Sequence, residues 1–186
     1  AVKIKDLVLD LNSASQLSFD LQPLHTEKVP LARLLRTLVA SHVNEGGGEC
    51  GLSLSVDEDA ANACVLGDER LLARAVENAL SNARLHNEGG CNVDVRLSMG
   101  GDAPSGRRWA CIEVADDGVG VSDGDLAKLE ARLAAARVDG EVREETGGHG
   151  LGLVLVDRIA RAHGGALALS HAPQGGFSVR IELPLA

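Results

Sequence analysis

Apolar residues recur at helical spacing at the start of the chain. Ile4, Leu7, Leu11 and Ala14 follow one another in steps of three and four, a narrow stripe typical of a coiled-coil helix. Pro23 ends this pattern. The stripe is compatible with a helix packed on its own domain, but its narrowness favours the end of a longer helix that pairs with a second chain.

Three later segments carry the broader apolar face of a helix that covers a core. They span about residues 30–45, 68–86 and 151–163. Pro30 stands near the first position of the first of them, where a missing N–H costs nothing. Leucines in the segment 126–133 predict a further, short amphipathic helix.

Strict alternation of apolar and polar residues predicts the strands. Two single strands come before the helix at 68–86, and two hairpins come after it. The predicted strands are Leu52–Val56, Cys64–Leu66, Asn92–Met99, Arg108–Val114, Ala166–Ser170 and Phe177–Leu183.

This order of elements indicates an α+β fold, with a mixed sheet covered by helices on one face. It contains no βαβαβ repeat, which disfavours a dinucleotide-binding Rossmann domain, and no Walker-type phosphate loop. Residues 122–146 are charged, weakly patterned and lie between two glycine motifs, so we interpret them as a lid.

The amino-acid composition argues against several classes of function. The chain has 186 residues, enough for one well-packed domain, and its 2% of aromatic residues predict an aliphatic core. A net charge of −9 argues against binding to duplex nucleic acid, which needs clustered Lys and Arg. The four cysteines are scattered, which favours reduced thiols and a cytoplasmic location. No apolar run reaches membrane-spanning length.

The segment Gly147–Leu153 contains four glycines in seven residues and leads directly into an apolar helix. Backbone amides of such a loop can turn toward one point, and the first helical turn adds unpaired N–H groups. Together they can bind an anion, most often phosphate. On its own the motif is a weak signal, because glycine-rich loops before helices more often serve only as turns.

Two further motifs are ambiguous when taken singly. Asn78 and Asn82 lie one turn apart beside the apolar stripe of their helix, either facing solvent or offering oxygen ligands to a hard cation such as Mg²⁺. Asp116–Val121 follows a predicted strand, and its two glycines permit a sharp reversal and close approach of a flat ligand. An ordinary acidic turn is the alternative for this second motif.

In this order, Asn78–Ala83, Asp116–Gly120 and Gly148–Leu153 resemble the N, G1 and G2 boxes of the GHKL superfamily. This superfamily comprises sensor histidine kinases, gyrase, the heat-shock chaperone and mismatch-repair ATPases, and the flanking residues here are most similar to histidine kinases. The resemblance implies a two-layer α/β sandwich of Bergerat type over residues 23–186. Residues 1–22 resemble the end of a dimerisation and phosphoacceptor helix.

The resemblance implies a role for each matching residue in binding ATP and Mg²⁺. Asp116 would accept a hydrogen bond from the adenine amine, and Asn82 would ligate Mg²⁺ with Asn78 beside it. Glycines would let the backbone approach the purine or present amides to the phosphates. The implied base-contacting glycines are Gly118 and Gly120, and the implied phosphate-binding residues are Gly148, Gly150, Leu151 and Gly152.

This sequence departs from the family pattern at several positions. A lysine frequent after the N box is replaced by Leu85, with Arg84 one residue earlier as a possible substitute. His149 stands where Thr or Ser is frequent, either without a role or as a donor to a phosphate. Asn78 occupies the place of the water-activating glutamate of hydrolytic members, and Glu77 is either a catalytic base or a surface residue.

The acceptor histidine of the family lies in an HExxTP-like context, which none of the six histidines of this chain has. His25 comes nearest but lies between two prolines. We therefore expect a catalytic domain that transfers the γ-phosphate to a histidine outside this chain, in the same protein or its dimer mate. A response regulator would be the next partner.

Two other functions remain open at this point. An anti-sigma-factor-type serine kinase of the same fold would phosphorylate a partner protein, although the N-terminal helical stripe argues against it. A nucleotide-free interaction module would explain the missing lysine. The presence of both glycine boxes together with Asp116 and Asn82 favours nucleotide binding.

Overall fold

The computed structural model describes residues 24–44, 51–85, 87, 90–102, 107–139 and 151–186. The predictions for residues 1–22 and for the glycine loop at 147–150 lie outside these ranges. The elements in chain order are β1 (Glu27–Pro30), α2 (Leu31–Asn44), β2 (Gly51–Val56), the 3₁₀ turn η2 (Glu58–Ala60), β3 (Cys64–Gly67), α3 (Glu69–Leu85), β4 (Asn92–Asp102), β5 (Arg107–Asp116), α4 (Asp123–Asp139), α5 (Leu151–Ala162), β6 (Ala166–His171) and β7 (Phe177–Pro184).

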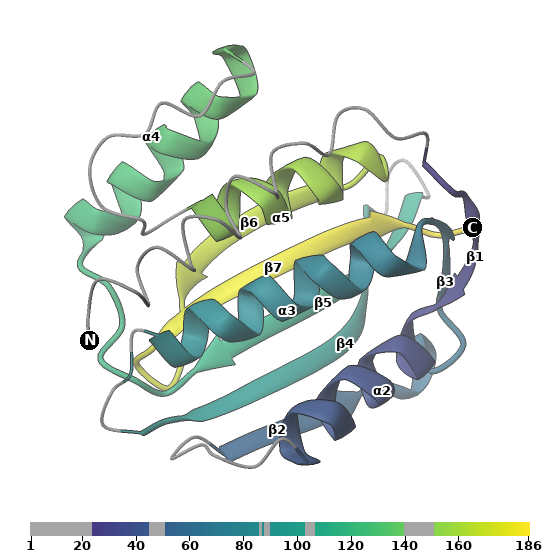
Figure 1. The fold of residues 1–186 in the computed structure, drawn as a ribbon, viewed down its shortest axis with the longest axis horizontal. Helices are drawn as coiled ribbons and strands as arrows, with labels where there is room; N and C mark the ends of the chain where they lie inside the picture. The colour runs from purple at the N-terminus through teal and green to yellow at the C-terminus, as the bar shows by residue number, and fades with distance from the viewer. Residues whose placement is uncertain (1–23, 45–50, 86, 88–89, 103–106, 140–150) are drawn as a thin grey trace.

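The main sheet has five strands in the order β2-β4-β5-β7-β6. β2 pairs with β4 in parallel, and all other neighbours are antiparallel, including both predicted hairpins. Helices α2, α3 and α5 cover one face of this sheet (Figure 1). The predicted α+β sandwich with a mixed, mainly antiparallel sheet is therefore confirmed.

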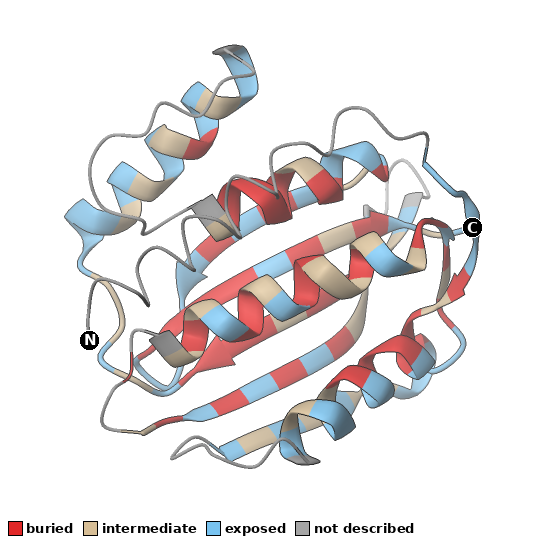
Figure 2. Cartoon of the chain, viewed as in Figure 1, coloured by how far each residue is buried: buried red, intermediate tan, exposed pale blue. Residues whose placement is uncertain are grey.

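The alternation along β4 shows why its residues form a strand of this sheet. Val93, Val95 and Leu97 are buried beneath the helices, whereas Asp94 and Arg96 between them are exposed. The helices bury one stripe each in the same way (Figure 2). Among the described residues, Phe177 is the one aromatic member of an otherwise aliphatic core.

The first helix begins differently from the sequence prediction. Pro30 ends the short strand β1, and α2 begins at Leu31. β1 pairs antiparallel with β3 in a separate two-stranded sheet, with Val29 opposite Val65. Proline is tolerated at the end of so short a strand because only a few ladder bonds are made there. Since β3 lies in this small sheet and β2 in the main one, the two consecutive predicted strands do not pair.

A buried histidine ties the end of α5 to the start of α3. The Nδ1–H of His163 donates to the carbonyl of Ile159 at 2.7 Å, and its Nε2 accepts from the backbone N–H of Asp68 at 3.0 Å. Gly67 makes room for the ring, because a Cβ there would lie 2.2 Å from His163 Cδ2. The Asp68 carboxylate in turn caps α3 by accepting from the N–H of Arg70.

The predicted lid contains a long helix. Residues 123–139 form α4, longer than the short helix expected from its leucines, and residues 140–146 lie outside the described ranges. Ser122 caps the helix, with its hydroxyl accepting from the N–H of Asp125 at 3.1 Å and donating to the Asp125 carboxylate. This N-cap contact explains why the helix begins at the end of the glycine turn.

Candidate functional site

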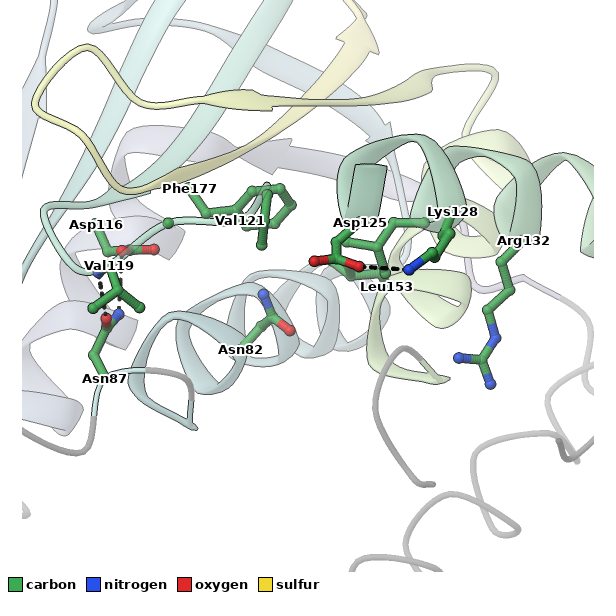
Figure 3. A pocket seen from close by; sticks show the side chains of 12 residues that line it. Asn82, Asn87, Asp116, Val119, Val121, Asp125, Lys128, Arg132, Leu153 and Phe177 are labelled. Atoms are coloured by element: carbon green, nitrogen blue, oxygen red, sulfur yellow. Dashed lines mark hydrogen bonds and ion pairs between the residues drawn. The ribbon is translucent and has the colours of Figure 1, made fainter. Parts of the chain in front are cut away.

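A cavity of about 380 Å³ opens between α3, the turn after β5, α4 and the start of α5. Its volume falls in the range of small-molecule sites. Polar side chains gather at its two ends, and apolar ones lie between them (Figure 3). The lining residues are Asn82, Asn87, Asp116, Val119, Gly120, Val121, Asp125, Lys128, Leu129, Arg132, Leu153 and Phe177.

Asp116 forms one end of the cavity and is 3% exposed. Its Oδ1 accepts two hydrogen bonds, from Asn87 Nδ2 at 3.1 Å and from the backbone N–H of Gly118 at 3.0 Å. Both donors fix the carboxylate in one orientation at the end of β5. The sequence prediction that Asp116 is a site residue agrees with this position in the cavity.

Asn87 is a site residue that the sequence reasoning missed. Its Nδ2 donates to the carbonyl of Ala83 at 2.7 Å as well as to Asp116, and its Oδ1 accepts from the N–H of Val119 at 3.2 Å. Asn87 thus joins the end of α3 to both sides of the Asp116 turn. The residues around Asn87 predict a polar turn. Its position shortly after the N box is the one sequence signal that could have identified it as a site residue.

The two glycines of the Asp116 turn serve protein packing. A Cβ at Gly118 would lie 1.6 Å from Asn87 Oδ1, so this glycine makes room for the Asn87 side chain. Gly120 has a φ of +65°, and a Cβ there would lie 2.7 Å from the carbonyl oxygen of Gly175. Of the two, Gly120 is among the residues that line the cavity.

The turn between β6 and β7 packs beneath Asp116. A Cβ at Gly176 would lie 1.9 Å from the backbone oxygen of Asp116. The sequence predicts this turn only as a hairpin connection. Its role in holding the Asp116 turn depends on a close tertiary approach that no local pattern encodes.

The asparagines of α3 are placed differently from each other. Asn82 lines the cavity. Asn78 donates from Nδ2 to the carbonyl of Arg74 at 2.8 Å, and its Oδ1 lies 3.2 Å from where a Cβ of Gly152 would stand. Gly152, in the first turn of α5, therefore packs on Asn78 rather than on the cavity lining. Glu77 is exposed and is not among the cavity residues.

Of the predicted phosphate-binding residues, the structure places two. Leu151 is the first residue of α5, and Gly152 follows it, half-buried. Gly148, His149 and Gly150 lie outside the described residues. The start of α5 lies next to Leu153, which lines the cavity, and it brings to this side of the site backbone N–H groups that have no acceptor within the helix itself.

Charged side chains of α4 line the end of the cavity away from Asp116 (Figure 3). Lys128 Nζ donates to Asp125 Oδ1 at 2.9 Å. This hydrogen bond raises the pKa of Lys128, and together with the bond from Ser122 it lowers the pKa of Asp125. Arg132 lines the same end, whereas Arg84, the substitute suggested by the sequence, is not among the lining residues.

An ion pair with a buried carboxylate holds α4 against α5. Arg137 donates to both oxygens of the Asp157 carboxylate, at 3.0 and 2.6 Å, and Arg161 donates to the same carboxylate at 3.2 Å. The Asp157 side chain is 4% exposed. The hydrogen bond with Asp157 raises the pKa of Arg137. This bidentate contact fixes the C-terminal part of α4 to the core.

Residues 67–186 match the family model of histidine kinase-, DNA gyrase B- and HSP90-like ATPases. The chain belongs to this ATPase family. The match begins just before α3 and includes every element that lines the cavity. The family resemblance inferred from the three glycine and asparagine motifs is therefore confirmed.

The relatives of this ATPase domain are sensor kinases. The signal transduction histidine-protein kinase BaeS of Escherichia coli K12 is 33% identical over 65% of the chain, and the probable sensor histidine kinase TcrY of Mycobacterium tuberculosis H37Rv is 30% identical over 98%. The chain spans 24% of BaeS and 36% of TcrY. Full-length ShkA, solved in complex with AMPPNP, matches with a TM-score of 0.69 and 26% identity over 99% of this chain and 37% of ShkA.

Two other structural features are absent from the described residues. No group of three or more His, Cys, Asp and Glu side chains there is arranged to hold a metal ion. Within the same part of the chain, no helix is long and apolar enough to span a membrane.

Proposed function

We propose that the cavity of this ATPase domain binds ATP as its Mg²⁺ complex, with the base at Asp116 and the phosphates beyond Asn82. The observation that carries the proposal is that Asp116 and Asn82, from elements far apart in sequence, line one cavity. Between them lie apolar side chains, including the ring of Phe177, that suit the faces of a purine.

Asp116 gives the base end its selectivity. Its Oδ1 is engaged by Asn87 and Gly118, which leaves Oδ2 as the acceptor for an exocyclic amine. Adenine carries such an amine at the position where guanine carries a carbonyl oxygen, which a carboxylate repels. The buried, fixed carboxylate therefore favours adenine over guanine.

The cavity lining includes an oxygen donor that suits Mg²⁺. The amide oxygen of Asn82 is a hard ligand of the kind Mg²⁺ accepts, and Mg²⁺ takes its remaining ligands from phosphates and water. When bound, the ion neutralises part of the phosphate charge. Asn82 would hold the ion, while the amides of Leu151 and Gly152, with those of Gly148 and Gly150, would bind phosphate oxygens. Phosphoryl transfer then depends mainly on position and electrostatics.

The phosphoryl acceptor is a histidine in a part of the protein outside this chain. His163, which is buried, uses both ring nitrogens in hydrogen bonds within the core and is therefore not available to attack a γ-phosphate. The relatives are sensor histidine kinases, which favours a histidine kinase over the serine kinase alternative. A response regulator would receive the phosphoryl group next.

Calorimetric titration of the chain with ATP, with and without Mg²⁺, tests this function. We expect saturable ATP binding that strengthens with Mg²⁺, and a loss of this Mg²⁺ dependence in Asn82→Ala. Glu77→Gln, on the exposed side of the same helix, is the matched control and should bind as the wild type does. Absence of saturable binding to the wild-type chain would contradict the proposal.

A further inference from the structure

The cavity contains two cations that no motif assigns. Lys128 and Arg132 both line it, and both come from α4. They are four residues apart, so they project from the same face of the helix. Figure 3 shows them at the end opposite Asp116, with Asn82 between the two ends. On the proposed orientation of the nucleotide, this is the end that receives the outer phosphates.

The site is negatively charged, so binding a triphosphate there requires cations. Asp116 and Asp125 both line the cavity, and the chain as a whole carries a net charge of −9. A triphosphate brings several further negative charges, of which one Mg²⁺ ion neutralises only a part. The position after the N box is occupied by Leu85, and Arg84 is outside the cavity lining. The described lining therefore offers positive charge from α4.

The position of α4 is fixed at both ends. Asp123 in its first turn contacts His171 Nε2 of β6 at 2.8 Å, and the Arg137–Asp157 pair holds its last turns on α5. Leu133, between the two attachments and next to Arg132, is 5% exposed. The helix can therefore present Lys128 and Arg132 to a ligand without first folding around it, which lowers the entropic cost of binding.

We infer that Lys128 and Arg132 bind the outer phosphates of the nucleotide and take the place of the absent N-box cation. Asp125 neutralises Lys128 while no nucleotide is bound, and Lys128 exchanges this carboxylate for a phosphate oxygen on binding. The inference rests on the proposed function, because it requires the nucleotide to bind with its base at Asp116.

Nucleotide titrations of the Lys128→Gln and Arg132→Gln variants test the inference. Each charge-assisted bond to phosphate should contribute about tenfold in affinity, so each variant should bind MgATP about tenfold more weakly than the wild type. Adenosine, which lacks phosphates, should bind both variants as it binds the wild type. Arg36→Gln is the control, because it removes the same charge from an exposed position on α2.

The outcomes separate this inference from the proposed function. If the wild type binds MgATP and both variants bind it equally well, the inference is overturned and the proposed function stands. If the wild type binds no adenine nucleotide, both are overturned. An equal loss of ATP and adenosine affinity would also contradict the inference, since it would show a loss of the fold or of the base site.

Asp125→Asn tests the exchange of partners by Lys128. Asparagine keeps the shape of the capping contact with Ser122 but removes the negative charge that competes with phosphate. We expect about threefold tighter MgATP binding, a modest gain because the pair is solvent-exposed. Unchanged or weaker binding would show that Asp125 does not compete for Lys128.

Discussion

The side chains at the two ends of the cavity differ in burial and in how firmly they are held. At the base end, Asp116 is 3% exposed and fixed by hydrogen bonds, and Gly118 and Gly176 make room for its neighbours. At the phosphate end, the side chain of Lys128 is 80% exposed, and its ion pair is formed within one helix. The proposed base end is part of the core, whereas the proposed phosphate end is a set of side chains on the surface of the molecule.

This difference separates the consequences of substitution at the two ends. Changes at the base end should reduce both the free energy of unfolding and nucleotide affinity, because the same contacts serve both. Changes at the phosphate end should reduce affinity alone.

Gly176→Ala should have the largest effect. Its Cβ would lie 1.9 Å from the backbone oxygen of Asp116, which cannot move without displacing the end of β5. We expect a loss of about 3 kcal/mol in the free energy of unfolding, measured by urea denaturation. Gly124→Ala is the control: its Cβ meets nothing closer than Ser122 Oγ at 3.8 Å, and alanine suits the first turn of α4. Equal stabilities of the two variants would contradict the close approach.

Two asparagine variants compare the ends directly. Asn87→Ala removes hydrogen bonds to Asp116 and Val119 at the base end, and should cost about 2 kcal/mol of unfolding free energy as well as ATP affinity. Asn82→Ala should leave the thermal denaturation midpoint nearly unchanged and weaken only Mg²⁺-dependent binding. If both variants lost similar stability, the contrast between the two ends would be wrong.

Arg137→Met tests the attachment of α4. It removes the bidentate contact with Asp157 and should lower the free energy of unfolding by about 1.5 kcal/mol, while Arg161 still pairs with the buried carboxylate. Because α4 carries Lys128 and Arg132, MgATP affinity should fall too, and adenosine affinity should not. Arg161→Met, which removes a single bond, serves as the control with a smaller effect.

Asp68, which does not line the cavity, should make the free energy of unfolding depend on pH in acid. Burial of Asp68 raises the pKa of its carboxyl. Hydrogen bonds from Arg70 and from the His25 backbone lower this pKa by more than burial raises it, so the pKa lies below its ordinary value. A depressed folded pKa stabilises the protein above about pH 4, and this contribution is lost as the pH falls through the folded pKa. Asp68→Asn should cost about 1 kcal/mol at pH 7, and the difference should vanish in strong acid. A pH-independent difference in urea midpoints would contradict this role.

Ionic strength should produce the smallest effect. Exposed charges at the phosphate end are screened by salt, whereas the buried contacts at the base end are not. Raising the salt concentration from 50 to 300 mM should weaken MgATP binding by about threefold and leave adenosine binding unchanged. Equal salt dependence for both ligands would show that the two ends do not differ in this way.

The sequence was sufficient wherever a local pattern carries the information. Alternation and helical periodicity located the main helices, the sheet strands and both hairpins, because each buries one face of its own residues. The order of three motifs indicated the family, and Asn82, Asp116 and Gly120 line one cavity as that order implies. The extent of α4 was underestimated because its leucines form only a short stripe.

The rest depends on contacts between distant segments. β1 is a strand only because it pairs with β3, and its Val-Pro end resembles the start of a helix. Asn87, Gly67 and Gly176 owe their roles to close approaches of elements far apart in the chain, and their neighbours in the sequence suggest turns. Lys128 and Arg132 line the cavity because α4 packs against α5, and the local sequence does not indicate this packing.

The ratio of GTP to ATP dissociation constants, measured in Mg²⁺ for the wild type and for Asp116→Asn, tests the central claim most directly. A fixed carboxylate that selects the adenine amine predicts a ratio above about 100 for the wild type. The ratio should fall toward one in Asp116→Asn, with the fold of the variant verified by circular dichroism. Equal binding of GTP and ATP by the wild type, or an unchanged ratio in the folded variant, would contradict the assignment of Asp116 as the base-recognising residue.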